Sequence, residues 1–143
     1  MSLFRRRRRR VELLLPPAPV DPWPAMRAIV AEAVIWQDAA EALLADVRAR
    51  LPLSELAPRG GPLVSRFVEL EHGLPISDDP EVVRRTTELR QLLSHHAHMI
   101  SASLNMLATD WRSERIVEQL DKLDGLGEPA RRLEAFWDEL KVN

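Results

Sequence analysis

The 143-residue chain contains no cysteine, no tyrosine, two lysines and five glycines. The absence of cysteine excludes disulfides, thiolate metal sites and a cysteine nucleophile, and it fits a reducing compartment. The few glycines form no glycine-rich phosphate loop. No apolar run approaches the roughly 18 residues that a membrane-spanning helix needs. What remains is a charged, alanine- and leucine-rich chain, long enough to bury a core as a single soluble domain.

Two aspartate–proline pairs mark the beginnings of the two longest predicted helices. Asp21 and Asp79 each place a capping carboxylate before a proline, whose missing N–H costs nothing in the first helical turn. The first helix is predicted from Pro22 to Leu51 and the second from Pro80 to Ala108. Both would be about 40 Å long at a rise of 1.5 Å per residue. Matched lengths favour antiparallel pairing.

In both helices the apolar positions recur at alternating spacings of three and four residues, which keeps them on one face. In the first helix this face consists of Met26, Val30, Ala33, Gln37, Ala40, Leu44, Val47 and Leu51. In the second it consists of Val82, Thr86, Leu89, Leu93, His96, Ile100, Ser103 and Leu107, with Leu92, Met99 and Met106 beside it. We therefore expect His96 to lie in the core and to bond to a neighbour.

Three shorter helices complete the prediction. Gly60-Gly61-Pro62 indicates a helix that begins at Pro62 and ends at His72, and two more are expected over Trp111 to Asp124 and Glu128 to Val142. No window shows the alternation of a strand. The sequence therefore predicts an all-α fold, a bundle of about five helices with two long antiparallel helices, forming one domain over residues 21–143.

Residues 1–20 differ from this domain in charge. They contain six consecutive arginines: Arg5, Arg6, Arg7, Arg8, Arg9 and Arg10. Without these six, 14 basic residues face 22 acidic ones, so a cationic arm is joined to a body of formal net charge −8. The apolar stretch from Val11 to Leu15 is shorter than the roughly 7–15 apolar residues of a secretory signal, and the prolines after it predict a stiff spacer. We expect a cytoplasmic protein.

The arginine run predicts a phosphate-rich partner. Crowded guanidinium groups need counter-ions, their forked geometry suits phosphate oxygens, and a polyanion releases condensed cations on binding. We predict binding to the backbone of nucleic acid, RNA more than DNA, without sequence readout. An anionic membrane, an acidic protein surface and a solubilising tail without a partner are the alternatives.

In its length, its helix content and the basic segment Arg5 to Arg10, the chain resembles the small all-helical subunits of CRISPR ribonucleoprotein effector complexes. The resemblance implies a non-catalytic helical subunit that lies along nucleic acid and packs against other protein subunits or a second copy of itself. No cofactor is expected.

Arg90 and His95 carry an enzymatic alternative. Their spacing resembles the Arg-x4-His pattern of the HEPN ribonucleases, which implies that the two side chains steady the phosphate and move the proton. Residues five apart in a continuous helix point about 140° away from each other, so this hypothesis requires a helix break near Arg90. A third hypothesis is a peripheral membrane or scaffold protein, in which Leu3, Phe4 and Leu13 to Leu15 insert beneath lipid-bound arginines.

Two histidine-containing patterns fall short of a metal site. His95 and His98 lie about 60° apart on one helix face, with Glu88 or Gln91 as candidate further ligands, but zinc sites use three or four converging ligands. The segment Glu69 to His72 supplies one Glu-x-x-His motif, whereas a ferritin-like di-iron bundle needs two. We therefore predict no metal.

Overall fold

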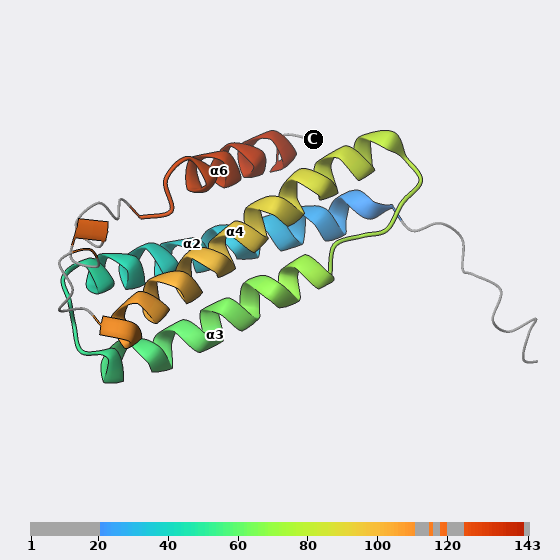
Figure 1. The fold of residues 1–143 in the computed structure, drawn as a ribbon. Helices are drawn as coiled ribbons and strands as arrows, with labels where there is room; N and C mark the ends of the chain where they lie inside the picture. The colour runs from blue at the N-terminus through green and yellow to red at the C-terminus, as the bar shows by residue number, and fades with distance from the viewer. Residues whose placement is uncertain (1–20, 111–114, 116–117, 120–124, 142–143) are drawn as a thin grey trace, which may run out of the picture.

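The computed structural model describes residues 21–110, 115, 118–119 and 125–141, and its regular structure there is entirely helical (Figure 1). The named helices of this part are α2 (Pro22–Arg48), α3 (Leu53–His72), α4 (Pro80–Asp110) and α6 (Glu128–Lys141). The predicted all-α class is confirmed. The arm of residues 1–20 and most of the fifth helix predicted over residues 111–124 lie outside the described residues.

Both aspartate caps form as predicted. The side chain of Asp21 accepts a hydrogen bond from the backbone N–H of Trp23 at 3.1 Å, and that of Asp79 accepts one from Glu81 at 2.9 Å. Each carboxylate thereby satisfies an otherwise unpaired N–H of the first helical turn.

Helix α2 ends earlier than its apolar spacing predicts. Arg50 adopts a left-handed φ of 62°, and the N–H of Leu51 reaches back to the carbonyl of Asp46 at 3.2 Å. This is a Schellman closure. Since Leu51 precedes Pro52, the proline ring disfavours a helical conformation there. The helix therefore stops at Arg48, and Leu51 packs half-buried at the rim of the core.

Helix α3 corrects the prediction that a short helix begins at Pro62. It begins at Leu53 and passes through Gly60, Pro58 and Pro62 without interruption. The two prolines remove two backbone hydrogen bonds, but burial of one continuous face outweighs that loss. This face consists of Leu56, Gly60, Leu63, Phe67 and Leu70. At Gly60 a Cβ atom would lie 2.2 Å from Cδ1 of Leu104, so glycine permits the close approach of α3 to α4.

The full length of α3 also overturns the predicted antiparallel pairing of the two long helices. Asp46 pairs with Arg59, while Glu32, earlier in α2, pairs with Arg66, later in α3, so α2 and α3 are antiparallel. Residues 73–79 reverse the chain again, and α4 consequently runs parallel to α2 (Figure 1). Antiparallel neighbours are supplied by α3 and α6 instead.

Helix α6 packs on α2 and α4, and α3 covers the same two helices from another side. Two glycines with left-handed φ values, Gly125 at 67° and Gly127 at 66°, shape its approach. They flank Leu126, whose side chain is buried and whose N–H donates to the carboxylate of Glu41 at 3.1 Å. The chain is thus fastened to α2 just before α6 begins.

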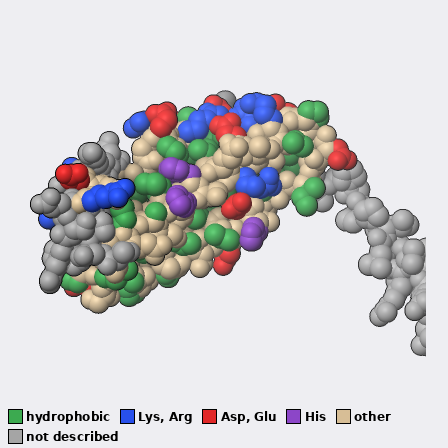
Figure 2. Space-filling view, viewed as in Figure 1, with side chains coloured by type: hydrophobic (Ala, Val, Ile, Leu, Met, Phe, Trp, Pro, Cys, Tyr) green, Lys and Arg blue, Asp and Glu red, His purple; other side chains and the backbone are tan. Residues whose placement is uncertain are grey.

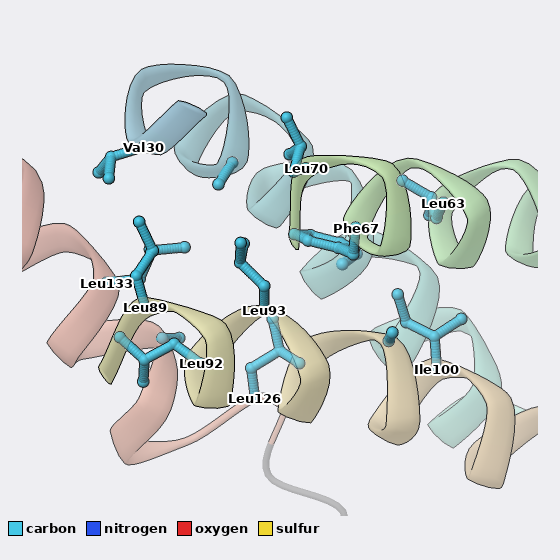
Figure 3. Packing of buried hydrophobic residues seen from close by; sticks show 14 of the residues in the cluster. Val30, Leu63, Phe67, Leu70, Leu89, Leu92, Leu93, Ile100, Leu126 and Leu133 are labelled. Atoms are coloured by element: carbon cyan, nitrogen blue, oxygen red, sulfur yellow. The ribbon is translucent and has the colours of Figure 1, made fainter. Parts of the chain in front are cut away.

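The four named helices of the described residues, α2, α3, α4 and α6, contribute to one core. Every predicted face position of α4 is buried, as is every predicted position of α2 except Leu51. Figure 3 shows side chains from α2, α3 and α4 converging around Val30, Phe67 and Leu93, with Leu133 of α6 beside Leu89. The alternating spacing of three and four residues therefore located the core correctly.

Candidate functional site

A shallow, open groove lies on the face formed by α3 and α4, with a volume of about 490 Å³ and an exposed lining that is mainly apolar. Its lining consists of Glu71 from α3 and Arg90, Gln91, Ser94, His95 and His98 from α4. Figure 2 shows histidine side chains gathered on the face that these two helices present.

The helical period explains why these α4 side chains share one surface. The α4 lining occupies positions i, i+1, i+4, i+5 and i+8, which span about 12 Å along the axis at 1.5 Å per residue. The core residues Leu93 and His96 point away from this strip and are fully buried. The same periodicity that builds the core thus leaves a row of hydrogen-bonding groups exposed.

Arg90 and His95 both line the groove, but they lie toward opposite sides of the strip. Helix α4 is continuous from Pro80 to Asp110. The break near Arg90 that the Arg-x4-His hypothesis requires is therefore absent, and the two side chains reach the groove at diverging angles of about 140°.

Six of the eleven arginines in the described residues form ion pairs with carboxylates of the bundle. The arginines in such ion pairs are Arg59, Arg66, Arg84, Arg85, Arg131 and Arg132. In Figure 2, blue and red side chains alternate along the upper edge, where α6 and the beginning of α4 lie. Within the described part of the chain, Arg90 forms no such pair. The groove therefore keeps one guanidinium available to a ligand.

The densest ion-pair cluster joins α4 to α6. Arg132 contacts Glu88 and Glu139, and Arg85 contacts Glu139 from the neighbouring helix. Both guanidinium groups lie over the ring of Phe136, that of Arg85 at 5.2 Å and that of Arg132 at 5.5 Å from the ring centroid. Hydrogen bonds from Arg132 and Arg85 lower the pKa of Glu139. This cluster stabilises the docking of α6, and Glu88 is occupied there rather than beside His95.

A buried polar network lies beneath the groove strip and links three helices. The side chain of His96 is fully buried, with Nδ1 at 2.6 Å from the carbonyl of Leu92 and Nε2 at 2.7 Å from Oε1 of Gln37. The Gln37 amide donates to the carbonyl of Ala130 and to Glu134 of α6. Burial lowers the pKa of His96 to about 4; the Leu92 carbonyl opposes this shift, and His95 adds to it. The predicted core histidine is confirmed.

The remaining candidate residues occupy separate places. Glu69 is paired with Arg66 on the surface of α3. Among the described residues, no three His, Asp or Glu side chains converge as metal ligands. None of the described helices combines the length and the apolar content that a bilayer-crossing segment requires. The arm arginines, Arg5 to Arg10, lie outside the described residues.

Sequence reasoning found part of the groove and missed the rest. It singled out Arg90, His95, His98 and Gln91, but as fragments of different sites. The helical phase of α4 was the signal that could have joined them. Glu71 became recognisable as the opposite wall only once α3 was placed beside α4.

Comparison of the chain with protein-family models, with curated proteins and with solved structures gives no match.

Proposed function

We propose that this protein is a non-catalytic helical subunit that grips the phosphate backbone of RNA through Arg5 to Arg10 and packs with other subunits, or with itself, in a nucleoprotein assembly. The observation that carries the proposal is the internal pairing of the bundle's arginines. Because these six charges are paired within the bundle, the unbroken run of six adjacent arginines is the densest cationic feature of the chain.

The charge balance supports different roles for the arm and the bundle in binding a polyanion. A body of formal net charge −8 repels a polyanion at long range, whereas six adjacent guanidinium groups attract one. The arm is therefore expected to set affinity and the bundle to limit how much of the backbone is covered. The proposal predicts backbone binding with little sequence preference.

Removal of residues 1–10 tests the assignment. Helicity and melting temperature should barely change, and retention of single-stranded RNA at low salt should collapse. If the six arginines contact six phosphates, the affinity of the intact protein should fall about 300-fold between 50 and 200 mM salt, from a slope of about −0.7 per phosphate contact on single strands.

A matched control removes charge from the bundle instead of the arm. The double variant Arg84→Gln, Arg131→Gln takes away two exposed guanidinium groups and should leave RNA retention almost unchanged. A full-length variant with glutamine at positions 5–10 separates charge from chain length. RNA retention by the truncated protein equal to that of the intact protein would refute the proposal, and co-flotation with phosphatidylserine vesicles in place of RNA retention would favour the membrane alternative.

The enzymatic alternative makes a different prediction. A ribonuclease using Arg90 and His95 loses RNA cleavage on substitution of His95 while RNA binding persists. The uninterrupted course of α4 through Arg90 supports the non-catalytic proposal instead.

A further inference from the structure

We propose that the groove between α3 and α4 is a binding site for one ribonucleotide unit, with the phosphate on the α4 wall and the ribose hydroxyls on Glu71. The inference rests on the proposed function only in its choice of RNA chemistry. The groove itself is argued from its own side chains, independently of residues 1–20.

The α4 wall offers a set of donors that suits a phosphate group. Arg90 supplies a permanently charged fork that matches phosphate oxygens, and within the described residues no carboxylate engages it. Ser94 adds a hydroxyl, Gln91 an amide, and His95 and His98 each at least one ring N–H. Arg90 and Ser94 lie one turn apart on the same side of the strip, so a single phosphate can meet both donors without a rearrangement of the backbone.

The α3 wall contributes the opposite chemistry. Glu71 is the acidic group of the groove lining, and an ionised carboxylate only accepts hydrogen bonds. It repels a second phosphate and accepts hydrogen bonds from hydroxyl groups, as acidic residues that bind ribose do. A ligand with an anionic end and a hydroxyl-bearing body fits both walls. The 2′-hydroxyl of RNA is the group that DNA lacks, so the groove should distinguish ribonucleotides from deoxyribonucleotides.

The four histidines of the chain supply a direct readout. Ring ¹H–¹³C spectra of the full-length protein are recorded during titration with AMP, with dAMP and with inorganic phosphate. We expect saturable shifts of His95 and His98 with AMP, and no shift of the fully buried His96, which serves as an internal control. Loss of one hydrogen bond to a charged carboxylate should weaken binding of dAMP about tenfold relative to AMP.

Paired variants assign the two walls. Arg90→Gln should abolish the shifts with all three ligands, whereas Arg131→Gln, which removes the same charge from the exposed surface of α6, should not. Glu71→Gln should remove the preference for AMP over dAMP, whereas Glu55→Gln, an exposed glutamate elsewhere on α3, should preserve it. Circular dichroism of each variant confirms the fold.

The outcomes separate this proposal from the arm. A short RNA without a terminal phosphate shifts His95 and His98 if the groove accepts a nucleotide within a strand, and leaves them unchanged if it accepts a free nucleotide. Both results support the proposal when the AMP shifts depend on Arg90. Absence of saturable shifts, shifts that persist in Arg90→Gln, or equal affinity for AMP and dAMP overturns it. RNA retention that depends on residues 1–10 is unaffected by such a failure, so the arm and the groove are judged independently.

Discussion

Acidification should destabilise the bundle through His96, whose ring lies fully buried between α2, α3 and α4. Burial holds the pKa of His96 at about 4, below its ordinary value of 6.5. The folded protein therefore resists protonation of this ring, while the unfolded chain takes up a proton below pH 6.5. The contribution of the neutral His96 ring to the free energy of unfolding is fully present above pH 6.5 and is lost as the pH falls toward 4. With 1.36 kcal/mol for each pKa unit, the loss reaches about 2.5 kcal/mol by pH 4.5.

The groups around the His96 ring either reinforce or oppose the lowering of its pKa. His95, on the same helix, adds positive charge and favours the neutral ring. The carbonyl of Leu92 and Oε1 of Gln37 both accept hydrogen bonds, and a neutral ring donates to one of them at a time. From α6, Glu134 reaches the same network through the Gln37 amide. From α3, the uncharged ring of Phe67 lies 5.2 Å away. The prediction is that desolvation outweighs the two acceptors.

Urea unfolding followed by circular dichroism at pH 7.5, 6.5, 5.5 and 4.5 measures the effect. The comparison protein is His96→Gln, which keeps an amide donor in the core and does not titrate. Carboxylates whose pKa is lowered by arginine neighbours, such as Glu32 and Glu81, destabilise both proteins equally at acid pH, so their effect cancels in the difference. The wild type should lose about 2.5 kcal/mol more than the variant between pH 7.5 and 4.5. Parallel pH profiles, or a wild type that gains stability relative to the variant, would show that the two carbonyls stabilise the charged ring and that this reasoning is wrong.

Two glycine pairs give matched stability predictions. Gly61 lies in α3 with no atom near its Cβ position, so Gly61→Ala should stabilise the protein by up to about 1 kcal/mol through helix propensity. Gly60→Ala should destabilise it by about 1–2 kcal/mol, because the new Cβ collides with a leucine side chain of α4. Equal melting temperatures of the two variants would show that this leucine moves aside. Before α6, Gly125→Ala and Gly127→Ala should each lower the free energy of unfolding by about 1–2 kcal/mol, because alanine disfavours the left-handed backbone conformation at these positions. Gly125→Ala should be the worse because its Cβ would lie 2.2 Å from Oε2 of Glu41, and thermal unfolding that ranks the two variants in the opposite order contradicts the contact.

The sequence predicted those parts of the fold in which one signal was unbroken. Helix α4 carries its spacing of three and four residues from Val82 to Leu107 with no proline or glycine inside, and every predicted position is buried. Helix α3 carries the same spacing from Leu56 to Leu70, but the sequence Gly60-Gly61-Pro62 indicated a helix start in its middle. Local propensity was given more weight than the periodicity, and the packing of Gly60 against α4 decides in favour of the longer helix.

That single error changed the predicted topology. With only a short helix predicted between the two long helices, the sequence favoured antiparallel pairing of the long helices. With the complete α3 between them, they run parallel. The groove combines residues of α4, whose relative phase is calculable, with Glu71, whose position depends on how α3 aligns with α4. Alignment between helices follows from contacts such as the tilted ring pair of Phe67 and His96, which are long-range and leave no local pattern in the sequence.

The order of the helices gives the molecule two unlike poles. Residue 21, at the junction with the arginine-rich segment, lies at the same pole as the 73–79 connection, which carries the completely exposed Ile76 (Figure 1). The 49–52 turn lies at the far pole, one helix length away. A probe or immobilising tag attached at that turn would therefore hold the particle by its remote end and leave the arm's pole facing outward.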